Sequence, residues 1–273
     1  MKIIDQPKGS RSAPKQGCSL GGFTFVELLV VVAIIAILAS LLSAALNQTK
    51  AKAHQITCLT NLRQLQLGWL SYVDDNSDQL PLNRSTDSPN EQLFGRRNAL
   101  GSWVVGRPKE DITTRNIVKG TLYPYIRSVG IYRCPEDRST VVGHPFPRTR
   151  SYSMSFYMNG DAAGMEPRVK TIHSAIENPS PDKVFVFIEE HEDSVWAGSF
   201  SVAPPEKGVL ATPIWLSTPA ERHNRGYNLS FADGHVEYWK WSSSKGLLPV
   251  SRPSADRHEI RDLRRLQDGV PKP

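Results

Sequence analysis

The chain has 273 residues, of which 39% are apolar and 22% charged, and its formal net charge is +6. This length allows one or two domains, and this composition excludes a broadly disordered chain. Half of the net positive charge lies before residue 22, so the remainder, at +3, lacks the concentrated basic face that nucleic-acid binding needs. No nucleic-acid partner is expected.

The first 46 residues divide into a polar segment and an apolar one. Residues 1–22 contain four basic side chains with several glycines and prolines, which predicts a flexible leader. Residues 23–46 would form a helix of about 36 Å, which exceeds the roughly 30 Å hydrocarbon core of a bilayer. The sequence predicts one membrane-spanning helix over 23–46, with a cytoplasmic N-terminus because the basic side chains precede it.

Glu27 is the only formal charge between Phe23 and Leu46. A lone carboxylate costs about 2.5–3.5 kcal/mol at the centre of a membrane helix. Gly22 has no side chain to hinder a protease, and cleavage after it would free an α-amine on Phe23. Phe23 and Glu27 are four residues apart and share a helix face, so that ammonium and the carboxylate could neutralise each other within or between chains.

The segment Gly22-Phe23-Thr24-Phe25-Val26-Glu27-Leu28-Leu29-Val30 resembles the processing signal of type IV prepilins and type II secretion pseudopilins. The resemblance implies that a membrane prepilin peptidase cuts after Gly22 and methylates Phe23, and that Glu27 is needed for assembly. It also implies a single-pass protein of the bacterial inner membrane. Its partners would be other pilin or pseudopilin subunits in a homo- or hetero-polymer, an inner-membrane assembly platform and the lipid bilayer.

The helix is predicted to continue beyond the membrane. Residues 47–80 form its amphipathic continuation, which is expected to run to about Val73 and to be stopped by Pro81. The apolar residues at helical spacing are Ile56, Leu59, Leu62, Leu65, Trp69, Leu70 and Val73. Such a stripe favours packing on a globular domain.

Residues 81–250 are predicted to form a β-rich periplasmic or extracellular domain, which makes the fold class α+β and pilin-like. The expected strands are Trp103–Val105, Ser151–Met158, Lys183–Ile188, Tyr227–Phe231 and Val236–Trp241. The last two form a hairpin, with Asp233-Gly234 as paired positive-φ residues at its turn. Residues 251–273 are predicted to be a charged tail, with a short solvated helix over 254–267.

Three later motifs extend the resemblance to a pseudopilin-like subgroup. They are the segment that begins at Cys58, the segment Tyr132–Asp137 around Cys134, and His223 followed after nine residues by Asp233-Gly234. The resemblance does not establish what these motifs do.

Cys58 and Cys134 both follow the membrane helix, on the side where disulfides persist. A bond between them would close a loop of about 76 residues and contribute roughly 4 kcal/mol in the chain-entropy model. Two separate buried thiols are the alternative, and both interpretations stay open.

His223, Asp233 and His235 are candidate metal ligands, with Glu189 or Glu190 as further donors. Histidines suit zinc and carboxylates suit calcium, and some pseudopilins bind calcium near their C-terminus. The simpler interpretation, which we favour, makes Asp233 part of a structural turn. The acidic cluster Glu189–Asp193 is expected to be a solvated loop.

No nucleophile, dinucleotide, P-loop or zinc-protease motif is present in the sequence, and no catalytic residue is nominated. The sequence therefore favours a structural subunit that is not an enzyme and that needs no cofactor.

Three alternatives remain. One is a surface-displayed binding module exported through the pilin pathway, with exposed aromatics around Trp239 and Trp241. Another is a membrane-anchored hydrolase, which needs a cleft of convergent polar groups. The third is an ordinary signal peptide cut near Ser43-Ala44-Ala45.

Overall fold

The structure is a computed structural model, and it describes residues 22, 24–86, 97–204, 213–242, 252–253 and 256–273. The chain divides into two compact units, 1–48 and 49–273. The predicted leader, 1–22, lies outside the described residues apart from Gly22. The unit boundary falls close to the predicted end of the membrane segment.

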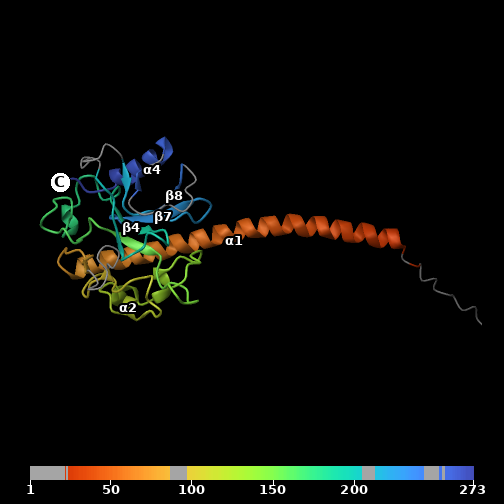
Figure 1. Cartoon of the computed structure of the whole chain (residues 1–273), viewed down its shortest axis with the longest axis horizontal. Coiled ribbons are helices and arrows are strands. Elements are labelled where there is room, and N and C mark those ends of the chain that lie inside the picture. Colours follow the sequence, from red (N-terminus) through yellow and green to blue (C-terminus); the bar gives the residue numbers. More distant parts are fainter. Residues whose placement is uncertain (1–21, 23, 87–96, 205–212, 243–251, 254–255) are drawn as a thin grey trace, which may run out of the picture. The chain divides into compact units, whose positions relative to one another are not determined.

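The helix α1 runs from Phe25 to Asp75 without a break, 51 residues in all. No proline interrupts it, and the chain leaves it through Ser77 and Asp78, whose φ angles are +53° and +67°. The predicted single helix ending near Val73 is confirmed. The orange ribbon in Figure 1 follows this helix from end to end.

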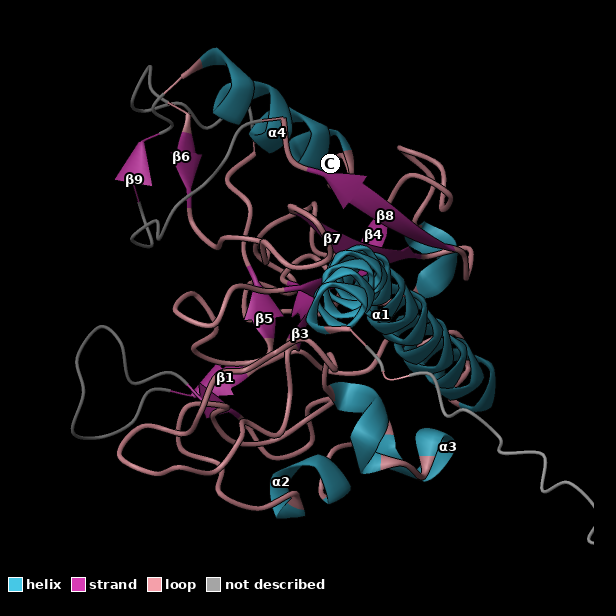
Figure 2. Cartoon of the chain, turned by 90° about the vertical axis from the view of Figure 1, so that its right-hand side faces the viewer, coloured by secondary structure: helices cyan, strands magenta, loops and turns pink. Residues whose placement is uncertain are grey.

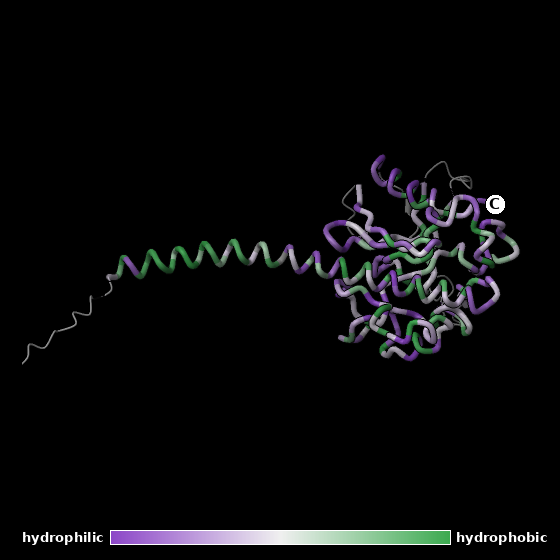
Figure 3. Tube along the Cα trace, turned by 180° about the vertical axis from the view of Figure 1, so that it is seen from behind, coloured by the Kyte–Doolittle hydropathy of each residue, from purple (hydrophilic) through white to green (hydrophobic). Residues whose placement is uncertain are grey.

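Within the first unit, α1 is apolar on every side. All side chains described between Thr24 and Leu46 are exposed, and Figure 3 shows the unbroken apolar run. This part of α1 is long and apolar enough to cross a membrane. A helix with apolar residues on every side is stable in lipid or in a bundle of similar helices, because neither surrounding presents water to it.

Within the second unit, α1 buries one face in the core. Leu62, Leu65 and Trp69 are fully buried, whereas Leu67 on the other side is 51% exposed. Two positions differ from the predicted stripe: Ile56 is exposed and Cys58 is buried. The buried face is therefore rotated slightly from the one that the large apolar residues alone predict.

The main sheet has five strands in the order β5-β3-β4-β7-β8. Its pairs are antiparallel except β3 with β5, which are parallel. The strands are β3 (Tyr152–Ser155), β4 (Phe185–Glu189), β5 (Ser199–Phe200), β7 (Gly226–Phe231) and β8 (Val236–Lys240). The pairing of β4 with β7 changes register between Phe185 and Ile188, which indicates a β-bulge or irregularity there.

The remaining elements are short. Two further antiparallel pairs join β1 (Ser85–Thr86) to β2 (Arg97–Asn98) and β6 (Ile214–Trp215) to β9 (Arg252–Pro253). The short helices are α2 (Arg115–Val118), α3 (Tyr123–Ile126), and the 3₁₀ turns η1 (Val129–Tyr132) and η2 (His173–Ala175).

Alternate residues of β7 face α1 and the opposite side of the sheet, as the two-residue period of a strand requires. Ser230 donates a hydrogen bond to Gln66 of α1, with 2.9 Å between the two oxygens. Tyr227 faces away and packs against Trp239 and Trp241. In Figure 2 the strands β7 and β8 lie between α1 and the last helix, α4 (Arg257–Asp268).

The helix α4 exists as predicted, but the expectation that it is solvated is wrong. Leu263, Leu266 and Val270 just beyond it are buried in the core shared with the sheet. The Asp256 carboxylate caps the helix by accepting from the backbone N–H groups of the second and third helical residues. The spacing of the few leucines, rather than the many charges, decides where this helix packs.

Four of the five predicted strands are present with boundaries shifted by up to three residues, and the hairpin β7–β8 is confirmed. Trp103–Val105 is not a strand: only the flanking residues Ser102 and Gly106 form isolated bridges, to Leu82 and Asn98. The hairpin turn also differs, because Gly234 has a φ of +100° and Asp233 is not in the left-handed region. The turn hydrogen bond runs from the N–H of Gly234 to the carbonyl of Phe231.

Replacing Leu65 with Ala is expected to lower the free energy of unfolding by about 2–5 kcal/mol, because it leaves a cavity in the core. The matched control Leu67→Ala, two residues along the same helix, should change it by less than about 0.5 kcal/mol. Chemical denaturation of the detergent-solubilised full chain measures both. If both variants lost the same free energy of unfolding, the assignment of Leu65 to the buried face of α1 would be contradicted.

Candidate functional site

The N-terminus of α1 is closed by a reciprocal pair of side chains. The backbone N–H of Thr24 donates to the Glu27 carboxylate at 2.8 Å, and its hydroxyl donates to the same oxygen at 2.7 Å. The N–H of Glu27 donates back to the Thr24 hydroxyl at 3.2 Å. This is a capping box, which satisfies backbone donors at the helix start. Thr-x-x-Glu before an apolar run is the sequence signal for this capping box, and it gives Glu27 a partner besides the amine of Phe23.

Gly22 has no structural reason to be glycine. A Cβ atom built on it would meet nothing within 4 Å, and its φ is not in the left-handed region. Phe23 lies outside the described residues. The described residues therefore give no packing or backbone reason for glycine at position 22.

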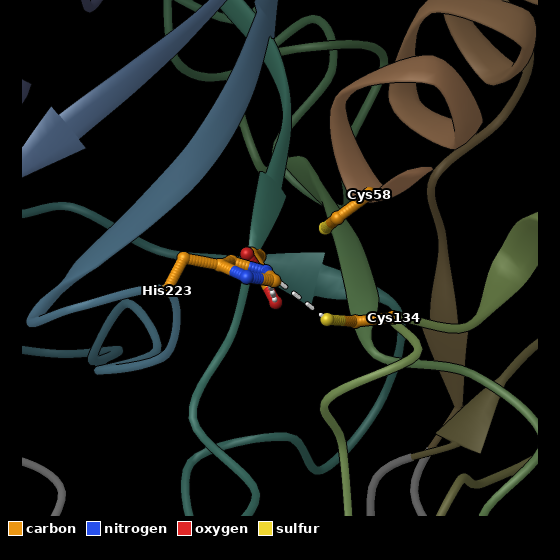
Figure 4. Close-up of side chains that lie close together, drawn as sticks. Cys58, Cys134 and His223 are labelled. Atoms are coloured by element: carbon orange, nitrogen blue, oxygen red, sulfur yellow. Dashed lines mark hydrogen bonds and ion pairs between the residues drawn. The ribbon is translucent and has the colours of Figure 1, made fainter. Parts of the chain in front are cut away.

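A second constellation lies inside the β-rich unit. One ligand atom each from Cys58, Cys134, Glu189 and His223 lies within 4.8 Å of all the others, and all four residues are buried. Nε2 of His223 is 3.2 Å from the Cys134 sulfur and 3.3 Å from Oε1 of Glu189. Figure 4 shows the two sulfurs and the imidazole pointing toward one another.

Four separate segments supply these side chains. Cys58 projects from the buried face of α1, and its sulfur is 3.0 Å from the Tyr152 hydroxyl. Cys134 follows η1, where its N–H donates to the Ser151 hydroxyl. Glu189 ends β4, and His223 lies three residues before β7. Residues more than a hundred positions apart are thus gathered at one point of the core.

His223 lies in an unusual backbone segment. His223, Asn224 and Arg225 have φ angles of +55°, +62° and +66°, so three consecutive residues other than glycine are left-handed. Such conformations cost about 1–3 kcal/mol each and gather at functional sites. The Tyr238 hydroxyl donates to the carbonyl of His223 at 2.8 Å.

Gly226 closes this left-handed turn. Its N–H donates to the Arg222 carbonyl at 2.8 Å. A Cβ atom at position 226 would overlap the Tyr238 ring and would lie 2.5 Å from the Trp239 carbonyl oxygen. Glycine is therefore required for β8 to approach the start of β7 and hold His223 in place.

Charged and polar neighbours surround the cluster. Arg222 places Nη1 3.3 Å from Oε1 of Glu189 and Nη2 3.4 Å from Asp137. Asn228 donates to Oε2 of Glu189 from both its backbone and its side chain, at 3.3 and 3.2 Å. Every oxygen of this buried carboxylate thus has a polar neighbour, as a buried charge requires.

The pKa values of the four groups are strongly perturbed. Burial raises the pKa of both thiols. Burial alone would also raise the pKa of Glu189, but the hydrogen bond from His223 and the charge of Arg222 lower it to about 2. Burial opposes protonation of His223, yet Cys134 and Glu189 raise its pKa to about 10. Without a metal ion the cluster is a buried imidazolium–carboxylate pair beside two neutral thiols.

The expected solvated loop at Glu189–Asp193 is wrong for its first two residues. Glu189 and Glu190 are 0% and 1% exposed. Burial raises the pKa of Glu190 to about 7, and the Ser194 hydroxyl donates to its Oε1 at 2.7 Å. Both carboxylates continue a buried strand, so the strand carries them into the core instead of out to solvent.

The predicted metal group is not assembled as a unit. Asp233 and His235 lie in the turn at the far end of β7, which separates them from His223 by about 20 Å at a rise of about 3.3 Å per residue. Nδ1 of His235 is 2.5 Å from Asp233, and its ring stacks on Phe231. His223 meets Glu189 instead. Both described cysteines join them as free thiols, with no bond between them.

Comparison with known families finds one match: residues 21–43 match the model of the prokaryotic N-terminal methylation motif. The chain carries a prepilin-type methylation signal. The matched range includes Gly22, Glu27 and most of the membrane helix, and such a signal marks a pilin-like protein exported through the type IV pilin pathway. No curated protein and no solved structure matches the chain.

Together with this signal, α1, which among the described residues is the one helix long and apolar enough to cross a membrane, fits a membrane-anchored, pilin-like protein. The long helix followed by a β-rich region agrees with the predicted α+β layout of a pilin. The match ends at residue 43, so the buried cluster and the rest of the β-rich unit must be understood from their own geometry.

Gly226→Ala is expected to lower the free energy of unfolding by about 1–3 kcal/mol, because the new methyl group overlaps the Tyr238 ring and the Trp239 carbonyl. Gly130→Ala is the matched control, since a Cβ atom there meets nothing within 4 Å. Thermal or chemical unfolding of the full chain distinguishes them. If Gly130→Ala lowered the stability and Gly226→Ala did not, the turn before β7 would tolerate a side chain at position 226, which would contradict the requirement for glycine there.

Proposed function

We propose that this chain is a structural subunit of a type II secretion pseudopilus or a type IV pilus-like filament. Prepilin peptidase removes residues 1–22 and methylates the new N-terminal Phe23. The helix α1 then packs with neighbouring helices, and the β-rich unit faces outward. The observation that carries the proposal is the methylation motif at residues 21–43, joined to one apolar helix.

Gly22 supports cleavage at this position. No described atom lies within 4 Å of where its side chain would be, so the proposed role of the glycine, to leave the backbone open to the peptidase, does not compete with a packing role. The four basic residues of the leader favour the cytoplasmic side of the membrane, which places the cut at the cytoplasmic face.

Glu27 has two roles in this proposal. Before cleavage its carboxylate caps α1 through Thr24, so the charge is hydrogen-bonded at the helix start. Cleavage adds a positively charged amine four residues away on Phe23. Inside a helix bundle, an unpaired Glu27 is drawn to the amine of a neighbouring subunit, because an isolated charge in an apolar surrounding is costly.

The role proposed for the β-rich unit is mechanical rather than catalytic. The alternative of an exported binding module relied on exposed Trp239 and Trp241, yet these are 7% and 4% exposed. Trp241 donates from its ring N–H to the Ala220 carbonyl, and Arg265 covers the face of Trp239. These aromatics hold the core together, and that observation favours the subunit over the binding module.

Two variants separate the charge of Glu27 from its capping role. Glu27→Gln keeps a side chain that can complete the capping box but removes the charge. It is expected to reduce incorporation into filaments at least about tenfold, because one charge of a buried pair without its partner costs several kcal/mol. Thr24→Ala removes the capping partner, costs about 1 kcal/mol of helix stability, and should leave incorporation largely intact.

The measurement is the fraction of processed chain recovered in sheared filaments or cross-linked oligomers, in the bacterium that encodes it. Loss of incorporation in Thr24→Ala with retention in Glu27→Gln would contradict the charge-pairing mechanism. Equal retention in both variants would contradict a role for Glu27 in assembly altogether.

A further inference from the structure

We propose that Cys58, Cys134, Glu189 and His223 form a structural zinc site that fastens the second half of α1 to the β-sheet. The four ligand atoms already lie within 4.8 Å of one another, and all four residues are buried. This proposal does not depend on processing or assembly, because every ligand belongs to the 49–273 unit.

The donor set favours zinc. Two thiolates, one imidazole nitrogen and one carboxylate oxygen are the ligand types that Zn²⁺ takes, at distances of about 2.0–2.3 Å. Ligand atoms around a tetrahedral zinc are then about 3.3–3.8 Å apart. The separations of 3.2 and 3.3 Å from His223 Nε2 to Cys134 and Glu189 are already close to those values. Calcium prefers six or more oxygen ligands, so sulfur donors exclude it here.

The surroundings supply the outer partners that metal ligands require. Histidines that bind metals usually direct the other ring nitrogen to a carboxylate, and His223 places Nδ1 3.4 Å from Oε2 of Glu136. The N–H of His223 donates to the same oxygen at 3.2 Å. Glu189 is fixed by the two hydrogen bonds from Asn228, which leaves Oε1 on the cluster side.

A cation lies beside the proposed site. Zn²⁺ with two thiolates and one carboxylate would have a net charge of −1, and the Arg222 guanidinium, which also contacts Asp137, lies 3.3 Å from Oε1 of Glu189. Without the ion, two buried free thiols occupy this polar pocket.

The backbone around His223 is a second, independent observation. Three consecutive left-handed residues hold this side chain toward the two sulfurs, and such strain persists only where the surroundings enforce it. The spacing from His223 to Asp233-Gly234 acquires a physical meaning: the histidine lies in the turn before β7, the Asp-Gly turn follows β7, and β8 returns Tyr238 to the histidine carbonyl.

A site of this kind is structural. Four protein ligands fill the coordination sphere, whereas catalytic zinc keeps an open position for water or substrate. The ligands come from α1, the segment after η1, the end of β4 and the turn before β7. Metal binding would therefore cross-link the helix to the sheet, and the binding free energy would become folding free energy.

The test uses the full chain, purified in detergent under reducing conditions, supplied with zinc and dialysed. Elemental analysis is expected to find about one zinc ion per chain, as one set of four ligands requires. Cys58→Ser and His223→Gln should lose it. The matched control His235→Gln removes a histidine outside the cluster and should retain it.

Glu136→Gln tests the outer partner separately. It should weaken zinc binding about 10–100-fold, measured by competition with a chromophoric chelator, since outer partners typically contribute that much. Unchanged affinity in Glu136→Gln would overturn the assigned role of Glu136 as the partner of the ligating histidine.

Because a ligand variant that fails to fold would also lose zinc, the unaltered chain supplies a second test. Removing zinc with a chelator should lower the thermal unfolding midpoint, and zinc, but not calcium, should restore it. Three results would overturn the proposal: no zinc retained by the reduced chain, equal zinc loss in His235→Gln, or a Cys58–Cys134 disulfide in protein isolated without reductant.

Discussion

The packing of the second half of α1 into the β-rich core is the contact on which the rest of the structure depends. Leu62, Leu65 and Trp69 enter a core that is shared with the sheet. The two halves of one helix therefore differ. The first half has apolar side chains on every side, and the second half buries a single face in the domain. The buried side chain of Gln66 accepts a hydrogen bond from Ser230, so the helix is joined to the interior strand β7 by a hydrogen bond as well as by apolar contact.

The buried polar cluster lies at this same junction. Cys58 is on the inward face of α1, and the groups that it meets come from β4, from the turn before β7 and from the segment after η1. Buried polar side chains packed this closely destabilise the fold unless each has a hydrogen-bond or charge partner. Arg222, Asn228 and Glu136 provide partners, and the proposed zinc ion completes them. The domain would thus be fastened to its helix at one internal point, a useful property for a subunit in a filament under mechanical load.

Local signals in the sequence predicted the local features. The absence of proline up to Pro81 predicted the length of α1, and alternation around Asp233-Gly234 predicted the β7–β8 hairpin. The burial of Glu189 could not be predicted, because its partners Arg222 and Asn228 are more than thirty residues away. The same holds for the meeting of His223 with Cys134, which depends on how four segments pack. The burial of α4 was not predicted, because the many charged side chains of this segment outnumber its two buried apolar residues, Leu263 and Leu266. The N-terminal signal, in contrast, can be recognised from the sequence alone, because its function depends on one short contiguous segment.

The central claim is that the junction at Gly22 is a processing site, which turns an exposed helix start into an assembly element. A lone Glu27 at the edge of an apolar helix is explained when cleavage creates its partner, the amine of Phe23. The most direct measurement is the mass of the mature N-terminal peptide from the chain isolated from its own bacterium. The account predicts a chain that begins at N-methylated Phe23. An intact Met1, or a chain that begins near residue 47 after cleavage by an ordinary signal peptidase, would contradict it.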